Sequence, residues 1–367
     1  MRLGLFMMPL HPLGRSMQSC LAEDTEKSIL IDRLGVDELW VGEHFTAGTE
    51  PYPSPMMFMA SLLPQTQRLV FGTGVINAPN RNPAVIAAEA AQFDHLSGGR
   101  FILGVGTGSL PTDFELFGVN GDAKARGRML IEHIDIIEKI WSQDPPYDIR
   151  GEFWTVSVKD RLFPEVGFGI MPKPLQRPRP PICIPAASPN SMSVLTAARR
   201  GWGPISSALI SPAGLANHWT LYQEGCLEAG RELDPANWRV VRPVFVAATD
   251  EEARARVLSP DSAYRYFFGH MLKVFTRTNY LDAIRPHPDM ADADITVDAI
   301  IESRLIFGSP QTVLARLIAL REQVGPFGNL LVSGMDWSGP NAAWERESLS
   351  RIATEVMPAF RRHAAAA

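Results

Sequence analysis

Short apolar runs alternate with longer segments of mixed polarity along this chain. Residues 3–8 are apolar and are followed by a proline, and residues 38–42 form a second apolar run. Such runs are typical of strands buried on both faces of a parallel sheet. Between them, residues 21–34 are predicted to form a helix that ends at Gly35. The same pattern predicts strands at 68–76, 100–105, 182–186, 203–207, 240–247 and 329–333, and helices at 56–63, 83–96, 126–141, 190–200 and the C-terminus.

Alternation of strand and helix from end to end predicts parallel β/α architecture. Eight strands in 367 residues favour one closed (β/α)8 TIM barrel, with residues 1–367 as a single domain, over an open doubly wound sheet. Two insertions exceed what a minimal barrel needs. Residues 143–181 are rich in proline and aromatic side chains, and residues 259–305 hold an aromatic run and an acidic run. Insertions of this length often form lids or pocket walls, and we expect that here.

Composition narrows the class of protein. Hydrophobic residues make up 46% of the chain, and the formal net charge is −5 without a basic stripe, so nucleic acid is not an expected partner. The sequence has no run of 18 apolar residues, so no membrane span is expected. The N-terminal apolar run lacks the cleavage site of a signal peptide. The cysteines Cys20, Cys183 and Cys226 have neither disulfide nor zinc spacing. We therefore expect a cytoplasmic protein.

The active site of a barrel lies where its strands end, so residues that directly follow predicted strands are candidates for chemistry. Glu43 and His44 follow the second strand. A carboxylate can hold a neighbouring histidine near neutral pKa, where the imidazole can donate or accept a proton. The alternative is a structural histidine beside a solvated glutamate. The pair is the sharpest catalytic candidate in the chain.

Polar and glycine-rich segments follow other predicted strands. Asn77 follows the third strand, and G-V-G-T-G (104–108) contains Thr107 and suits close approach of the backbone to a flat ligand. This segment lacks the spacing of a dinucleotide-binding fingerprint. The run S-P-N-S (188–191) lies between a strand and a helix, where it can bind an anion or simply cap the helix.

The segments that follow the first and the last predicted strand each contain a polar residue, to which the sequence assigns no role. Pro9, Leu10 and His11 follow the first strand, and G-M-D-W (334–337) follows the eighth. The eight histidines include no H-E-x-x-H pair, so no metal is expected. The sequence contains no G-x-S-x-G motif, which argues against a serine hydrolase.

Several motifs occur in an order that resembles the bacterial luciferase-like monooxygenases. They are W-V-G-E-H-F (40–45), F-G-T-G-V-I-N (71–77), N-P (82–83), F-D-H-L-S-G-G-R-F-I-L-G-V-G-T-G (93–108), D-F-E-L-F-G (113–118) and G-S-P-Q-T-V (308–313). The segments 43–50 and 104–113 look most similar to the limonene monooxygenase-like branch. The resemblance covers most of the chain.

This resemblance implies a two-component flavin-dependent monooxygenase. Reduced FMN from a separate flavin reductase reacts with O2 to give a peroxyflavin, which oxygenates a small, largely apolar organic substrate. His44 falls on the family's catalytic histidine and Glu43 on the acidic position before it. Luciferase has an arginine where this chain has Thr107, so phosphate binding must rely on other groups. Cofactor binding is expected at Gly74, Val75, Asn77, Thr107, Ser188, Asn190 and Ser191, with a non-proline cis peptide at Gly74–Val75.

Two alternatives remain open. T-G-V-I-N with R-N-P (73–83) looks equally similar to deazaflavin-dependent oxidoreductases, which share the barrel and transfer hydride. A non-enzymatic flavin-binding barrel is a third class, although storage does not need the Glu43–His44 pair. Epoxidation, hydroxylation and Baeyer–Villiger insertion are all compatible with the residues. The resemblance also implies a homodimer, and residues 56–63 offer an apolar stretch for its interface.

Overall fold

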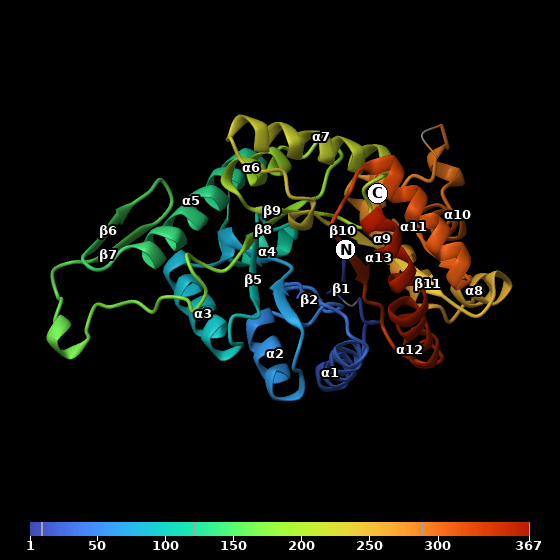
Figure 1. Ribbon diagram of the computed structural model, residues 1–367, viewed down its shortest axis with the longest axis horizontal. Coiled ribbons are helices and arrows are strands. Elements are labelled where there is room, and N and C mark those ends of the chain that lie inside the picture. The colour runs from blue at the N-terminus through green and yellow to red at the C-terminus, as the bar shows by residue number, and fades with distance from the viewer. Residues whose placement is uncertain (9, 120–121, 288, 367) are drawn as a thin grey trace. The chain divides into compact units, whose positions relative to one another are not determined.

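The structure is a computed structural model that describes residues 1–8, 10–119, 122–287 and 289–366. Strand and helix alternate as the sequence predicts (Figure 1). The strands are β1 (Arg2–Met7), β2 (Glu38–Val41), β3 (Val70–Thr73), β4 (Ile76–Asn77), β5 (Phe101–Gly106), β6 (Tyr147–Arg150), β7 (Thr155–Val158), β8 (Ile182–Ala186), β9 (Gly203–Ser206), β10 (Arg239–Arg242), β11 (Val244–Val246), β12 (Ile306–Gly308) and β13 (Asn329–Ser333).

The helices follow the strands along the chain. They are α1 (Met17–Arg33), α2 (Pro55–Leu62), α3 (Pro83–Leu96), α4 (Pro111–Leu116), α5 (Ala123–Ser142), α6 (Met192–Arg200), α7 (Pro212–Glu228), α8 (Asp250–Val257), α9 (Ala263–Arg277), α10 (Val297–Arg304), α11 (Pro310–Val324), α12 (Asn341–Arg351) and α13 (Met357–Ala366). Among the described residues, no helix is both long and apolar enough to cross a membrane.

The main sheet has the strand order of a closed parallel barrel, which confirms the predicted fold class. The order is β3-β2-β1-β13-β10-β9-β8-β5, with β4 continuing the line of β3 and with β3 also paired to β5. The register of β1 and β13 is parallel from Arg2 opposite Asn329 to Phe6 opposite Ser333. Short parallel strands joined by helices bury both faces, which explains their continuous apolar sequences.

The contacts divide the chain into two compact units. Unit 1 comprises Met1–Trp40 and Pro185–Ala367, and unit 2 comprises Val41–Ile184. The strands β2 and β8 contribute residues to both units. The expectation that residues 1–367 form a single domain stays a prediction.

Two predicted strands are interrupted. The predicted strand 68–76 is divided into β3 and β4 by a cis peptide bond between Gly74 and Val75. The predicted strand 240–247 is divided at Pro243, which lacks the backbone N–H that a ladder needs. Its second half, β11, pairs in parallel with β12 in a separate two-stranded sheet.

The two insertions contain more regular structure than the sequence indicates. Residues 143–181 include an antiparallel hairpin of β6 and β7. Residues 259–305 include α9 and α10, and the aromatic run around Tyr264 and Phe268 packs into a buried core with Ile300 and Ile301. This aromatic run therefore belongs largely to the core of unit 1.

Helix α2 carries the apolar stretch that the sequence offers as a dimer interface. Met56, Phe58, Met59 and Leu62 are buried within the chain, whereas Met57 is 75% exposed. The folded protein therefore already covers most of this stretch. The homodimer stays a prediction, without support from a continuous apolar face on α2.

Candidate active site

The predicted pair Glu43–His44 directly follows β2 in unit 2. Glu43 is buried, and its carboxylate accepts hydrogen bonds from the backbone N–H of Asn77 at 3.0 Å and from Nε of Arg81 at 2.7 Å. The side-chain amide of Asn77 donates to the backbone oxygen of Glu43 at 3.0 Å. Arg81 also donates to the backbone oxygen of Pro53. These bonds fix the backbone on either side of Glu43.

Burial dominates the electrostatics of Glu43. It raises the pKa of the carboxyl group to about 7, although the Arg81 guanidinium and the backbone N–H of Asn77 favour the ionised form. The carboxyl group can therefore exchange a proton near neutral pH, a property that is common in active sites. The alternative reading of a solvated glutamate is wrong, because the side chain is enclosed.

His44 lies between two carboxylates. Its Nε2 is 3.2 Å from Oε2 of Glu50, and its Nδ1 is 3.6 Å from Oδ2 of Asp113. Nδ1 is buried and has no hydrogen-bond partner among the described residues. Asp113 in α4 also accepts hydrogen bonds from the backbone N–H groups of Phe45 and Thr46. The loop that carries His44 is thus held at its backbone, while one ring nitrogen stays available.

The residues expected to contact the flavin ring lie at or just after the ends of β3, β4 and β5. The Gly74–Val75 peptide bond is cis, as the resemblance implies. The hydroxyl of Thr107 bonds weakly to the next backbone oxygen, at 3.3 Å. Gly108 has φ +73°, and a Cβ there would lie 2.9 Å from Phe114 and 3.6 Å from Oδ1 of Asn77. Close packing and backbone conformation both require glycine at this position.

The predicted phosphate loop lies in unit 1. Ser191 occupies the N-cap position of α6, but its side chain does not cap the helix and instead bonds to the hydroxyl of Ser193 at 2.7 Å. The run 188–191 therefore supplies the N-cap residue of α6, as one of the two interpretations expects, but without a side-chain capping bond. The backbone oxygen of Ser188 accepts from His218 at 2.8 Å, and Asn190 accepts from Asn217 at 3.1 Å. These bonds fix the loop and leave the first turn of α6 without a side-chain cap.

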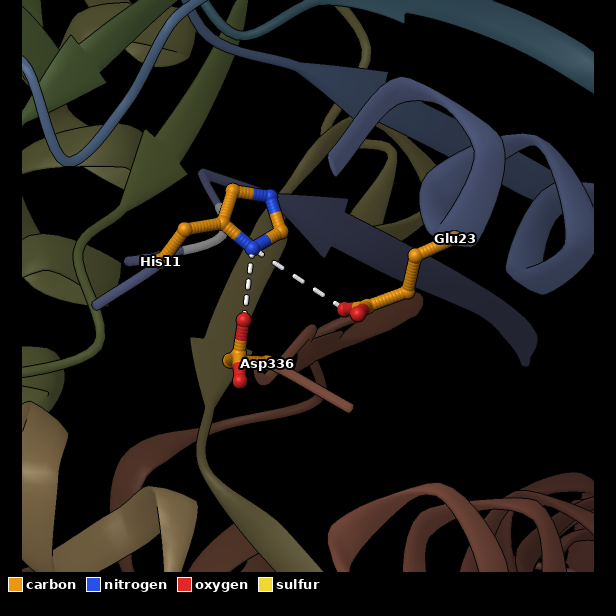
Figure 2. A group of neighbouring side chains, drawn as sticks. All are labelled: His11, Glu23 and Asp336. Carbon is orange, nitrogen blue, oxygen red and sulfur yellow. Dashed lines mark hydrogen bonds and ion pairs between the residues drawn. The ribbon is translucent and has the colours of Figure 1, made fainter. Parts of the chain in front are cut away.

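A second polar cluster lies at the ends of β1 and β13, also in unit 1. Figure 2 shows the ring of His11 facing the carboxylates of Asp336 and Glu23. His11 Nδ1 is 2.7 Å from Asp336 Oδ2, and Nε2 is 3.2 Å from Asp24 Oδ2. Arg15 bonds to both Asp336 and Glu23. Pro9, the first strand-end residue, lies outside the described residues.

These contacts make His11 a cation. Burial favours the neutral ring, but the hydrogen bonds to Asp24 and Asp336 outweigh it and raise the pKa of His11 to about 9. Burial likewise opposes ionisation of Asp336, yet bonds from His11 and Ser338 hold its pKa well below the usual range. Both ring nitrogens of His11 therefore carry protons at neutral pH.

The ligand atoms of His11, Glu23 and Asp336 all lie within 4.8 Å of one another, which is close enough for a metal ion. A metal would have to displace a proton from His11 and compete with Arg15 for both carboxylates. The electrostatics thus favour an ion-pair network at this position. The expectation that the protein uses no metal stays a prediction.

The network continues behind His11 through α1. Lys27 donates to Asp24 at 2.8 Å and to the backbone oxygen of Met335 at 2.7 Å. Burial raises the pKa of Glu345 to about 8, so this carboxyl group is mainly neutral at pH 7. Within the described part of the chain, the cluster then balances three cations (His11, Arg15 and Lys27) against three carboxylates (Glu23, Asp24 and Asp336).

The sequence pointed to the strand ends that carry His11 and Asp336 but gave neither residue a role. Their pairing joins positions 325 residues apart. The available signal was topological: the first and last strands of a closed barrel are neighbours, so polar residues directly after them meet. Arg81, which bonds Glu43, was not predicted, because its motif R-N-P indicates the family resemblance and carries no sign of a contact 38 positions away.

Comparison with known proteins settles the family. The sequence model of the luciferase-like monooxygenase family matches residues 1–326. The chain belongs to this family. The predicted class of enzyme is confirmed, because relatives that match almost all of the chain are named as monooxygenases.

Two relatives and one solved structure illustrate the match. The chain is 32% identical to 4-hydroxyprotoasukamycin monooxygenase of Streptomyces nodosus, over 97% of this chain and 91% of that protein. It is 32% identical to limonene 1,2-monooxygenase of Rhodococcus erythropolis, over 97% of this chain and 86% of that protein. The oxygenating constituent of 3,6-diketocamphane monooxygenase of Pseudomonas putida, solved in complex with FMN, has a TM-score of 0.88 at 28% identity, over 98% of both chains.

Proposed function

We propose that this enzyme uses reduced FMN, supplied by a separate reductase, and O2 to oxygenate a small organic substrate. The observation that carries the proposal is the Glu43–His44 pair at the end of β2, with a titratable carboxyl group on Glu43 and an Nδ1 on His44 that makes no hydrogen bond among the described residues. Reduced flavin supplies the electrons that O2 needs to react. We expect the enzyme to act in the cytoplasm.

Two features of the residues fit a flavin. The buried Nδ1 of His44 makes no hydrogen bond within the described structure, and its acidic neighbour, Oδ2 of Asp113, is 3.6 Å away, so its hydrogen-bonding capacity is left for a ligand atom. The first turn of α6 lacks a side-chain cap and lies beside the hydroxyl groups of Ser191 and Ser193. Free N–H groups at a helix N-terminus favour a phosphate. We therefore assign the phosphate to Ser188, Asn190 and Ser191, and the ring to Gly74, Val75, Asn77 and Thr107.

We assign the proton chemistry to His44. Its Nε2 lies 3.2 Å from Oε2 of Glu50, which orients the ring. Nδ1 then holds or moves a proton toward the bound reactants. Glu43 is a positioning residue, since its carboxylate bonds to Asn77 and Arg81 and fixes the backbone before His44.

The separate reductase is supported by a relative that is named as the oxygenase component of a flavin-dependent trigonelline monooxygenase. The second candidate is deazaflavin-dependent hydride transfer. It is favoured by a relative named as a coenzyme F420-dependent oxidoreductase of Mycobacterium tuberculosis, 30% identical over 226 residues. That match covers only 60% of this chain, whereas the matches to monooxygenases are nearly complete.

An anaerobic titration separates the two candidates. Purified protein is titrated with reduced FMN and, in parallel, with reduced deazaflavin, and oxygen is then admitted. The proposal expects saturable binding of reduced FMN and rapid consumption of oxygen by the complex. Tight binding of the deazaflavin alone, with no reaction with oxygen, would establish the second candidate instead.

A further inference from the structure

A small cavity opens beside the cluster at the ends of β1 and β13. Its volume is about 170 Å³, and all of its lining residues belong to unit 1. We call it the β1–β13 pocket. A dry cavity of about 150 Å³ can hold benzene, so this pocket has room for one six-membered ring or one end of a larger molecule. Its lining includes Pro12, Ser262, Ala263, Tyr266, Asp336 and Asn341.

The charges around the pocket favour a neutral ligand. Asp336 is the buried charged group of the lining, and His11 and Arg15 already compensate it. A ligand cation would compete with Arg15 for the same carboxylate. A ligand anion would approach Asp336 and also the exposed Asp261. Because the network behind Asp336 is balanced, neither sign of charge gains from entering.

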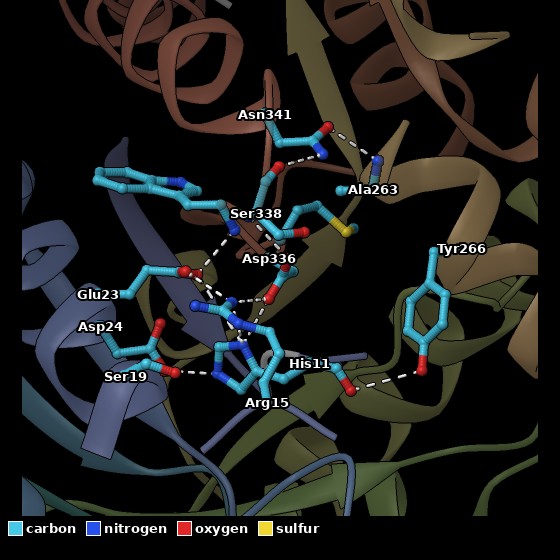
Figure 3. Close-up of polar contacts among 12 residues, drawn as sticks. His11, Arg15, Ser19, Glu23, Asp24, Ala263, Tyr266, Asp336, Ser338 and Asn341 are labelled. Atoms are coloured by element: carbon cyan, nitrogen blue, oxygen red, sulfur yellow. Dashed lines mark hydrogen bonds and ion pairs between the residues drawn. The ribbon is translucent and has the colours of Figure 1, made fainter. Parts of the chain in front are cut away.

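Most polar groups of the lining are already bonded to the protein (Figure 3). Asp336 accepts from His11, Arg15 and the backbone N–H of Ser338. The amide of Asn341 donates to the backbone oxygens of Asp261 and Ser338 and accepts from the N–H of Ala263. These groups hold the wall of the pocket and have little capacity left for a ligand.

Tyr266 differs from the other polar groups. Its hydroxyl donates to the backbone oxygen of His11 at 3.4 Å, a distance at which a hydrogen bond is weak. Burial raises the pKa of Tyr266 above its ordinary value, although a hydrogen bond with the backbone of Leu13 favours the ionised form. The phenol therefore keeps its proton. The pocket therefore contains a hydrogen-bond donor whose bond within the protein is easily exchanged for a better one.

We propose that the β1–β13 pocket binds a small neutral organic molecule through one acceptor oxygen, which takes the hydrogen bond of the Tyr266 hydroxyl. A carbonyl oxygen meets this requirement, and a hydrocarbon of the same shape does not. This inference rests on the proposed function in one respect: the molecule that binds is the organic substrate. It narrows the substrate class to compounds that carry an oxygen before the reaction begins.

The test compares two ligands of one shape. Methylenecyclohexane has a methylene group where cyclohexanone has its carbonyl oxygen. Each ligand is titrated into the full-length protein with and without oxidised FMN. Wild-type protein is expected to prefer cyclohexanone. Tyr266→Phe is expected to weaken binding of cyclohexanone about five- to tenfold, which matches the loss of one hydrogen bond, and to leave methylenecyclohexane unchanged.

Tyr280→Phe is the matched control, since Tyr280 is 48% exposed and is not part of the lining. It is expected to change neither affinity. Equal binding of the two ligands, no binding of either, or an equal effect of Tyr266→Phe on both would overturn the inference. Because these titrations contain no reduced flavin, their outcomes are independent of the anaerobic titration that tests the proposed function.

Discussion

His11 and Asp336 lie 325 positions apart in the sequence, yet Nδ1 of the imidazole is 2.7 Å from Oδ2 of the carboxylate. The bond joins the segment after β1 to the segment after β13, two strands that pair in parallel. Both groups are buried, so each depends on the other for its charge.

His11→Gln should destabilise the protein by about 3 kcal/mol at pH 6, because the buried cluster then holds three carboxylates against only two cations, Arg15 and Lys27. The folded-state pKa of about 9 lies above the ordinary value of 6.5, so the stabilisation is complete below pH 6.5 and is lost as the pH rises through 9. Urea unfolding of wild type and variant across this range measures the difference. His287→Gln, at an exposed histidine, should change stability by less than about 0.5 kcal/mol. A cost for His11→Gln that is independent of pH contradicts the charged state assigned here.

Glu43 should give the enzyme a titration near neutrality. Burial places its pKa at about 7, so the wild-type pH profile of kcat/KM should have an inflection there. Glu43→Gln keeps the size of the side chain but cannot ionise, and its profile should lack this inflection. Initial rates between about pH 5.5 and about pH 9 provide the measurement. If the variant keeps the wild-type inflection, another group is responsible for it.

His44→Ala should lower product formation by about 10²–10⁴-fold, the range for loss of a general acid–base group. Flavin binding and folding should change little, and hydrogen peroxide release should rise per flavin oxidised. The measurement is the ratio of product to flavin oxidised. His95→Ala removes an exposed histidine that bonds the backbone oxygen of Lys173, and it should keep the wild-type ratio. Normal coupling in His44→Ala would make His44 a structural residue.

Ser191→Asp should weaken binding of FMN by at least about tenfold and leave riboflavin unchanged, because a carboxylate at the N-terminus of α6 repels a phosphate and riboflavin has none. Fluorescence titration with the two flavins measures both affinities. Ser211→Asp is the control, since Ser211 caps α7 with its own side chain. If Ser191→Asp and the wild type bind FMN with equal affinity, the phosphate does not bind at the N-terminus of α6.

The sequence predicted the barrel because each strand and helix has a local pattern of its own. It predicted the positions of Glu43 and His44 for the same reason, since both directly follow an apolar run. The partners of these residues have no local signature: Arg81 lies 38 positions beyond Glu43, and their contact depends on the turn that follows β4. The interruption of a strand at Pro243 is visible in the sequence, but the pairing of β11 with β12 is not.

The balanced cluster has a consequence for how this enzyme can diverge. With three cations and three carboxylates assigned among the described residues, replacing one member leaves one opposite charge of the cluster uncompensated. A homologue that loses Arg15 is then expected to lose an acid at the position of Glu23 or Asp336 as well. The cluster should therefore leave a record of paired substitutions among related sequences, joining the first strand of the barrel to the last.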